Sequence, residues 1–194
     1  MVITPNNANV FFGFGHIFLQ QGQSDKAREM FNKANLLNPN LAELYYNRGY
    51  SYIRRGKFPD KAIADFNKAI EMNPNYAIAY NDRGNAYKAK GNPDRAISDY
   101  NKAIELNPNF PNPYYNLGLF YGDRGNCDKA IFYYNKTLEI DTKHYPAYTN
   151  RAIAYYFKKE YDKSWEDVHE AEELGVKINP EFLKKLKEAS GREK

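Results

Sequence analysis

Residues 77–110 read AIAYNDRGNAYKAKGNPDRAISDYNKAIELNPNF, and this stretch contains the pattern that decides the fold. Gly84 has an aromatic residue four positions before it and another three positions after it, a spacing that places both rings on one face of a helix. Gly91 then supplies a turn signal, and Asp94 suits the first turn of a second helix. The stretch therefore predicts two helices joined by a short turn.

The same pattern recurs along the chain. Its small anchor residues are separated by 34, 35, 34 and 34 positions, and they are Gly15, Gly49, Gly84, Gly118 and Ala152. A second series of small residues lies twelve positions after each anchor, or thirteen in the second repeat, and its members are Ala27, Ala62, Ala96, Ala130 and Ser164. A large residue follows each of these by four positions, at Phe31, Phe66, Tyr100, Tyr134 and Val168. A fixed period of this length predicts five stacked helix pairs.

Turn residues punctuate each repeat. Glycines separate the two helices of a repeat at Gly22, Gly56, Gly91 and Gly125, and prolines that force a break close three repeats at Pro39, Pro74 and Pro108. We expect a short extension over residues 1–7 and five repeats over 8–178, with boundaries at about 8–41, 42–76, 77–110, 111–144 and 145–178. Residues 179–194 should form an amphipathic helix and tail that cap the array.

The five concordant copies resemble the tetratricopeptide repeat (TPR), a helix pair of about 34 residues. The resemblance covers roughly residues 8–178. It implies an all-α fold, a right-handed α-solenoid of antiparallel helix pairs that forms a superhelix. It also implies a protein that binds other proteins and is not an enzyme.

Two positions vary together between the repeats. One position directly precedes the anchor, and the other directly precedes the large residue of the second helix. In three repeats they hold an arginine and an aspartate: Arg48 with Asp65, Arg83 with Asp99, and Arg151 with Asp167. In the other two repeats both are apolar or aromatic: Phe14 with Met30, and Leu117 with Tyr133. Charged residues thus accompany charged residues, and apolar ones accompany apolar ones. We predict that each pair is in contact between the two helices of one repeat.

The composition disfavours several other functions. The net charge is only +4, so we expect no nucleic-acid partner. His16, His144 and His169 lie in different repeats without metal-ligand spacing, and Cys127, placed in a turn, lacks the neighbours of a nucleophile. We therefore expect no catalytic residue, no metal and no cofactor. No apolar run approaches a membrane span and no signal peptide is evident, so we expect a cytoplasmic protein.

The resemblance implies that the first helices line a concave groove. The residues two positions before the anchors should face it, and they are Gly13, Asn47, Asp82, Asn116 and Asn150. Three of them, Asn47, Asn116 and Asn150, look like the asparagine ladder of O-linked N-acetylglucosamine transferase repeats, and Asp82 departs from it. We expect neighbouring groove residues at Tyr46, Tyr50, Asn81, Asn85, Tyr115, Tyr156 and Phe157. Amides and tyrosines suit an extended peptide, although packing between helices explains any one of these tyrosines equally well.

Two alternatives remain open. The first repeat is apolar at Val10, Phe11, Phe12 and Ile17, so its edge could form a homo-oligomer or meet further upstream repeats. The array could instead recruit substrates for a larger enzyme. A receptor for chaperone C-termini is disfavoured, because the window of Asn81, Asn85, Asn116, Pro146 and Asn150 lacks the cationic members of that clamp.

Overall fold

The computed structural model describes residues 7–38, 41–54 and 58–192. These residues form eleven helices and no strand, which confirms the all-α prediction. Consecutive helices pack as pairs, as expected for an α-solenoid. Parts of the sequence prediction lie outside the described residues: positions 1–6 of the extension, Pro39, Gly56 and residues 193–194 of the tail.

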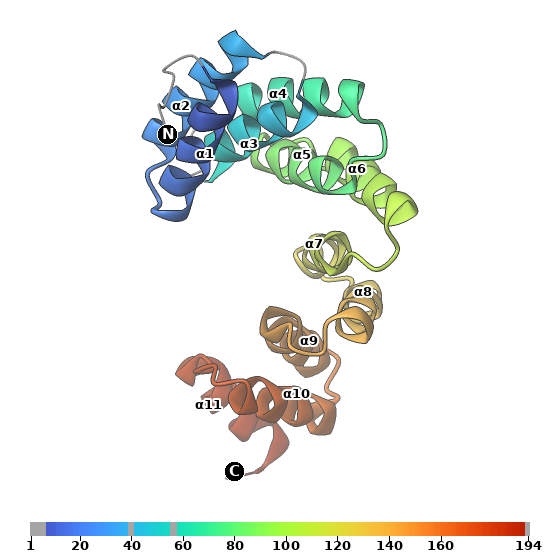
Figure 1. Cartoon of the computed structure of the whole chain (residues 1–194). Coiled ribbons are helices and arrows are strands. Elements are labelled where there is room, and N and C mark those ends of the chain that lie inside the picture. Colours follow the sequence, from blue (N-terminus) through green and yellow to red (C-terminus); the bar gives the residue numbers. More distant parts are fainter. Residues whose placement is uncertain (1–6, 39–40, 55–57, 193–194) are drawn as a thin grey trace. The chain divides into compact units, whose positions relative to one another are not determined.

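The chain forms two compact units, residues 1–108 and 109–194. The helices of the N-terminal unit run from blue to yellow-green in Figure 1 and are α1 (Ala8–Gln20), α2 (Ser24–Leu37), α3 (Ala42–Ile53), α4 (Pro59–Met72), α5 (Ala77–Ala89) and α6 (Pro93–Leu106). Each odd-numbered helix packs against the even-numbered helix that follows it. In addition, α3 contacts both α1 and α5, so these three helices lie side by side.

The C-terminal unit continues the pattern. Its helices are α7 (Pro111–Gly122), α8 (Cys127–Ile140), α9 (Tyr145–Phe157), α10 (Tyr161–Glu173) and α11 (Pro180–Ser190). Here α7 contacts α9 directly, and each packs against its own partner, α8 or α10. We call α1, α3, α5, α7 and α9 the first helices, and α2, α4, α6, α8 and α10 the second helices.

The anchor glycines allow the two helices of a pair to approach closely. A Cβ atom built on Gly84 would lie 2.6 Å from Cε1 of Tyr100 and 3.2 Å from the carbonyl oxygen of Ala96. The anchors Gly15, Gly49 and Gly118 meet the rings of Phe31, Phe66 and Tyr134 in the same way. In the fifth repeat the anchor is Ala152, and the smaller Val168 shares its cluster. The period in the sequence thus encodes a ring packed on a glycine.

The charged pairs predicted within repeats are confirmed. Arg83 donates two hydrogen bonds to Asp99, from Nε to Oδ2 at 2.8 Å and from Nη2 to Oδ1 at 2.6 Å. Arg48 with Asp65 and Arg151 with Asp167 repeat this geometry. The contacts of Phe14 with Met30 and of Leu117 with Tyr133 stay a prediction.

Each of these arginines also reaches the preceding second helix. Arg83 Nη1 donates to Oδ1 of Asn67 at 2.7 Å, and the equivalent bonds join Arg48 to Asn32 and Arg151 to Asn135. One arginine therefore links its own repeat to the repeat before it. The side chains of these arginines are only 17–18% exposed and those of their aspartates 3–9%, so the bridges are largely shielded from solvent.

The turns inside the repeats use a left-handed residue. Gly22, Gly91 and Gly125 have φ of 75°, 74° and 72°, a conformation that glycine adopts without steric penalty. In the fifth repeat the same position holds Lys159, with φ of 62°. Cys127, which we expected in a turn, is instead the first residue of α8, because the Asn126 side chain caps that helix by accepting a bond from the Lys129 N–H.

The last helix covers one side of α10. Leu186 is fully buried in a cluster with Trp165 and Val168, and the Trp165 indole donates to Ser190 Oγ at 3.1 Å. Asn179 caps α11 by accepting from the Glu181 N–H at 2.8 Å. Apolar burial and one hydrogen bond therefore fix α11 on the unit.

Candidate functional site

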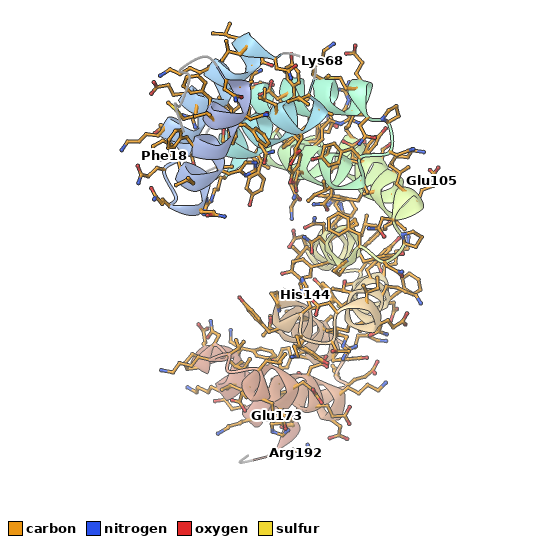
Figure 2. The ribbon with its side chains drawn as sticks, in the orientation of Figure 1. Phe18, Lys68, Glu105, His144, Glu173 and Arg192 are labelled. Atoms are coloured by element: carbon orange, nitrogen blue, oxygen red, sulfur yellow. The ribbon has the colours of Figure 1, made fainter. Side chains whose placement is uncertain are left out.

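The candidate site consists of the faces that the first helices expose within each unit. The predicted groove residues of the N-terminal unit lie on α1, α3 and α5, and those of the C-terminal unit lie on α7 and α9. Figure 2 draws the side chains and labels His144 at the N-terminal end of α9. Because the first helices contact one another inside each unit, their side chains can form a continuous row there.

The ladder asparagines are held by their own helices. Asn47 is 6% exposed, and its Nδ2 donates to the carbonyl oxygen of Glu43 at 2.7 Å. Asn150 donates in the same way to Pro146 at 2.8 Å. Asn116 is half-buried on α7. The helix thus engages the amide nitrogen of Asn47 and Asn150, and each side-chain carbonyl oxygen retains its capacity to accept.

Asp82 lies at the centre of a polar cluster in the N-terminal unit. It accepts hydrogen bonds from Tyr46 Oη at 2.9 Å, from Asn81 Nδ2 at 2.9 Å and from Asn85 Nδ2 at 3.4 Å. Burial raises the pKa of Asp82 above its ordinary value, although these three donors act in the opposite direction. Four predicted groove residues are therefore brought together, but Asn81 is only 2% exposed.

Aromatic rings cover this cluster. Tyr46 stacks on Tyr50 with ring centroids 6.2 Å apart, and it also contacts Tyr76 at 5.1 Å and Phe66 at 5.8 Å. Burial raises the pKa of Tyr46 far above its usual range and that of Tyr76 to about 12, so both phenols stay protonated near neutral pH. Tyr50 is 37% exposed and forms the accessible edge of the group.

The C-terminal unit has a second polar contact at equivalent positions. Asn150 Nδ2 donates to Tyr115 Oη at 3.0 Å, joining α9 to α7. The Tyr115 ring lies 4.7 Å from the ring of His144, which caps α9 by accepting from the Ala147 N–H at 3.2 Å. Burial lowers the pKa of His144 and favours the neutral form that this cap requires.

Tyr156 lies in a different environment from the other groove tyrosines. Its ring contacts Phe157, Tyr161 and Phe182 at centroid distances of 5.6, 5.9 and 5.8 Å. These contacts join α9 to α10 and α11, so Tyr156 packs beside the last helix. Phe157, in contrast, is 69% exposed.

The apolar edge expected in the first repeat is partly used inside the fold. Phe12 packs edge-on against His16 at 4.6 Å and contacts Phe31 at 5.9 Å, and Val10 and Phe11 are half-buried. Ile17 and its neighbour Phe14 are 47% and 45% exposed. These last two side chains are the accessible part of the edge.

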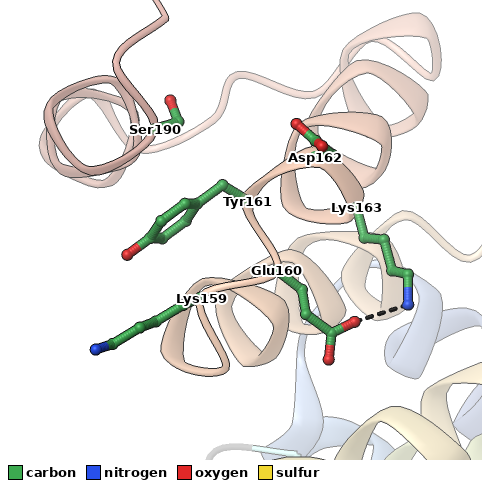
Figure 3. A pocket seen from close by; sticks show the side chains of 6 residues that line it. All are labelled: Lys159, Glu160, Tyr161, Asp162, Lys163 and Ser190. Carbon is green, nitrogen blue, oxygen red and sulfur yellow. Dashed lines mark hydrogen bonds and ion pairs between the residues drawn. The ribbon is translucent and has the colours of Figure 1, made fainter.

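A hollow of about 380 Å³ lies between the turn before α10 and the end of α11 (Figure 3). Charged groups line it, and they are engaged locally: Glu160 bonds Lys163 at 2.7 Å, and Asp162 bonds Arg192 at 2.8 Å. Ser190 accepts from Trp165. The hollow is therefore a junction of structural contacts.

Within residues 7–38, 41–54 and 58–192, no group of three or more His, Cys, Asp or Glu side chains has the geometry to hold a metal ion. Over the same ranges, no helix has the length and apolar character needed to cross a membrane.

The paired helices and the rings packed on glycine define a helix-pair repeat protein. A protein-family model described as TPR repeat matches residues 15–56, 51–91 and 84–123, and a second family model described as tetratricopeptide repeat matches residues 111–144. The chain therefore belongs to the tetratricopeptide repeat family. This family is generally a non-enzymatic scaffold for protein interactions, and the fold supports that general role here.

Solved structures agree with this assignment. A crystal structure of MamA is 30% identical with a TM-score of 0.70, over 83% of this chain and 94% of that chain. PilF of Pseudomonas aeruginosa is 19% identical with a TM-score of 0.84, over 95% of this chain and 84% of that chain. YrrB is 21% identical with a TM-score of 0.65, over 96% and 93%. PilF and YrrB show similarity of fold alone, and no curated protein sequence matched the chain.

Proposed function

We propose that this protein is a scaffold that binds an extended peptide or partner segment along its first helices. The observation that carries the proposal is the distribution of exposed apolar side chains. Of the twelve large apolar side chains exposed among the described residues, seven lie on first helices: Phe14, Ile17, Tyr50, Ile78, Tyr145, Ile153 and Phe157. The second helices hold only three, at Leu36, Leu37 and Phe132.

The polar residues beside these side chains suit a peptide backbone. The carbonyl oxygens of Asn47 and Asn150 can accept from backbone N–H groups of any sequence. The hydrogen bonds of both amides to their own helices hold them in place, which reduces the entropy that binding would otherwise cost. Tyr50 and Phe157 offer large contact areas beside them.

A structural neighbour supports the proposal. YrrB, which shares the fold, is described as a TPR protein with an unusual peptide-binding site. We expect the residues of a peptide-binding site on this chain to lie on its first helices.

The test is affinity capture from native lysate with variants of each unit. Tyr50→Ser with Ile78→Ser changes the N-terminal unit, and Ile153→Ser with Phe157→Ser changes the C-terminal unit. These side chains are 37–69% exposed, so we expect both variants to fold normally and at least one to lose the captured partner.

The matched control replaces apolar side chains that are at least as exposed on second helices. Leu36→Ser and Phe132→Ser remove residues that are 84% and 53% exposed. We expect both controls to retain the partner. Loss of the partner from the controls, with retention by the first-helix variants, would place binding on the second helices and overturn the proposal.

A second candidate is self-assembly through the first repeat, which the exposure of Phe14 and Ile17 favours. Light scattering over a range of concentrations tests it. A concentration-dependent oligomer that Phe14→Ser with Ile17→Ser converts to a monomer would establish this function. A monomer at every concentration would exclude it.

A further inference from the structure

A small cavity opens in the C-terminal unit beside the predicted groove residue Asn150. It measures about 150 Å³ and lies between the ends of α7 and α9 and the start of α8. Its walls include the apolar side chains of Leu119, Ile153 and Phe157. Ile153 and Phe157 are 38% and 69% exposed, so the cavity adjoins the surface proposed to bind a partner.

A glycine creates this cavity. The residue four positions after the anchor is Gly122 in the fourth repeat, whereas the other repeats have Leu19, Ile53, Lys88 and Tyr156 there. Leu19 packs in one cluster with Phe31, and Ile53 packs against the cluster of Phe66, so a side chain at this position covers the ring of the second helix. Gly122 has no such side chain, and Tyr134 lines the cavity instead.

The Tyr134 hydroxyl lacks the partner that its counterpart has. In the third repeat, Tyr100 Oη donates to Asn85 Oδ1 at 2.9 Å. The residue equivalent to Asn85 is Leu119, which cannot accept a hydrogen bond. Tyr134 as a whole is 2% exposed, and its hydroxyl lies 3.4 Å from the position of a Cβ built on Gly122. The hydroxyl is not one of the fully buried, unpaired atoms of the described residues, so the phenol presents it to the cavity.

Other polar atoms line the same space. Both amide hydrogens of Asn150 are engaged, by Tyr115 Oη and by the Pro146 carbonyl, which leaves its Oδ1 as an acceptor. The Asp123 carboxylate also lines the cavity. Burial raises the pKa of Tyr134, and the charge of Asp123 contributes, so the phenol keeps its proton. The cavity thus combines apolar walls with the phenol hydroxyl of Tyr134 and the amide oxygen of Asn150.

We propose that this cavity binds the side chain of a tyrosine in the partner segment. A cavity of about 150 Å³ is large enough for one aromatic ring. The apolar walls would hold the ring, and its hydroxyl would pair with Tyr134 Oη. A phenylalanine would fill the space but leave the Tyr134 hydroxyl buried without a partner, which weakens binding by about tenfold. The inference rests on the proposed function and names an anchor residue for it.

The test uses Cys127 as an internal reporter. It is the chain's only cysteine and it lines the cavity, so an occupant should slow its labelling by a thiol reagent. We expect N-acetyltyrosinamide to protect Cys127 in a saturable manner. N-acetylphenylalaninamide should need about a tenfold higher concentration for the same protection. No protection by either compound, or equal protection by both, would overturn the inference.

Two variants and a control localise the effect. Gly122→Leu restores the side chain of the first repeat and should abolish protection. Gly13→Leu makes the same change on α1, at a glycine where an added Cβ would meet no atom within 4 Å, and should leave protection intact. Tyr134→Phe removes one oxygen atom and should abolish the preference for the tyrosine compound, a result that does not depend on how well the glycine variant folds. Unchanged protection in Gly122→Leu, or an unchanged preference in Tyr134→Phe, would contradict the assignment. Absence of protection would overturn the tyrosine site but would not affect partner capture by the first helices. The two proposals can therefore be tested independently.

Discussion

The Tyr46 hydroxyl donates a 2.9 Å hydrogen bond to Asp82, and this contact joins α3 to α5. Tyr115 and Asn150 occupy the same two repeat positions on α7 and α9, but there the asparagine is the donor, at 3.0 Å. The position two residues before the anchor can thus bond the tyrosine of the preceding first helix with a carboxylate, as in Asp82, or with an amide, as in Asn150. The difference is that Asp82 places a titratable group in a buried site.

Replacing Asp82 with asparagine should stabilise the protein near neutral pH. Because burial raises the pKa of Asp82, the folded state binds its proton more tightly than the unfolded state does. Stability is therefore lost as the pH rises from the unfolded pKa of 3.8 through the raised folded value. We expect Asp82→Asn to unfold at a higher temperature than the parent near pH 7 and at a similar temperature below the unfolded pKa, as measured by circular dichroism.

The reverse substitution provides the control. Asn150→Asp puts a carboxylate beside Tyr115 and should lower the unfolding temperature more near pH 7 than in acid. A change in Asp82→Asn that is equal at both pH values would show that the charge of Asp82 is not responsible.

The bridge between Arg83 and Asp99 should be costly to break from one side. Arg83→Leu leaves Asp99, which is 5% exposed, without its cation, and such a loss costs about 3–5 kcal/mol. The double variant Arg83→Leu with Asp99→Tyr copies Leu117 and Tyr133 of the fourth repeat and should recover most of this free energy. Urea unfolding of the four proteins in the cycle measures the coupling. Additive effects of the two changes would show that the positions act independently.

The sequence predicted this bridge because two positions changed together. The fixed period identified the anchor glycines and the large residues of the second helices, but it did not predict that each ring packs on its glycine. It did not predict the bonds from Arg48, Arg83 and Arg151 to Asn32, Asn67 and Asn135. A signal existed, since asparagine lies two positions after the aspartate position in the first four repeats, at Asn32, Asn67, Asn101 and Asn135. These bonds join an arginine to an asparagine of the preceding repeat. A pattern within one repeat does not show which residues of neighbouring repeats come into contact.

The candidate site was predictable only in part, for a related reason. The period identified the row of Asn47, Asp82, Asn116 and Asn150, but the partners of these residues depend on packing between neighbouring helices. Tyr156 packs against Phe182 of α11, a helix outside the repeat. The cavity at Gly122 arises from a missing side chain, and glycine at that position has no distinctive signature until the ring beneath it is known.

The packing of Tyr100 on Gly84 makes the glycine sensitive to substitution. Gly84→Ala would place its Cβ 2.6 Å from the ring and 3.2 Å from a backbone oxygen, so the helices must separate. We expect a loss of about 1–3 kcal/mol, despite the higher helix propensity of alanine. Adding Tyr100→Val copies Ala152 and Val168 of the fifth repeat and should relieve the overlap. Thermal unfolding that is unchanged in Gly84→Ala would show that the helix pair adapts without strain.

Lys159 occupies the turn position that holds glycine in other repeats, and its φ of 62° is unfavourable for a residue with a Cβ atom. Its backbone N–H donates to the Tyr156 carbonyl at 2.9 Å, so the turn fixes this conformation, and its side chain points away from Glu160 in Figure 3. We expect Lys159→Gly to raise the free energy of unfolding by about 1 kcal/mol, because the backbone strain is removed. Gly125→Lys introduces the same strain one repeat earlier, where φ is 72°, and should lower stability by a similar amount. The midpoints of urea unfolding measure both changes. If Lys159→Gly is less stable than the parent, the lysine side chain stabilises the turn by more free energy than its backbone strain costs.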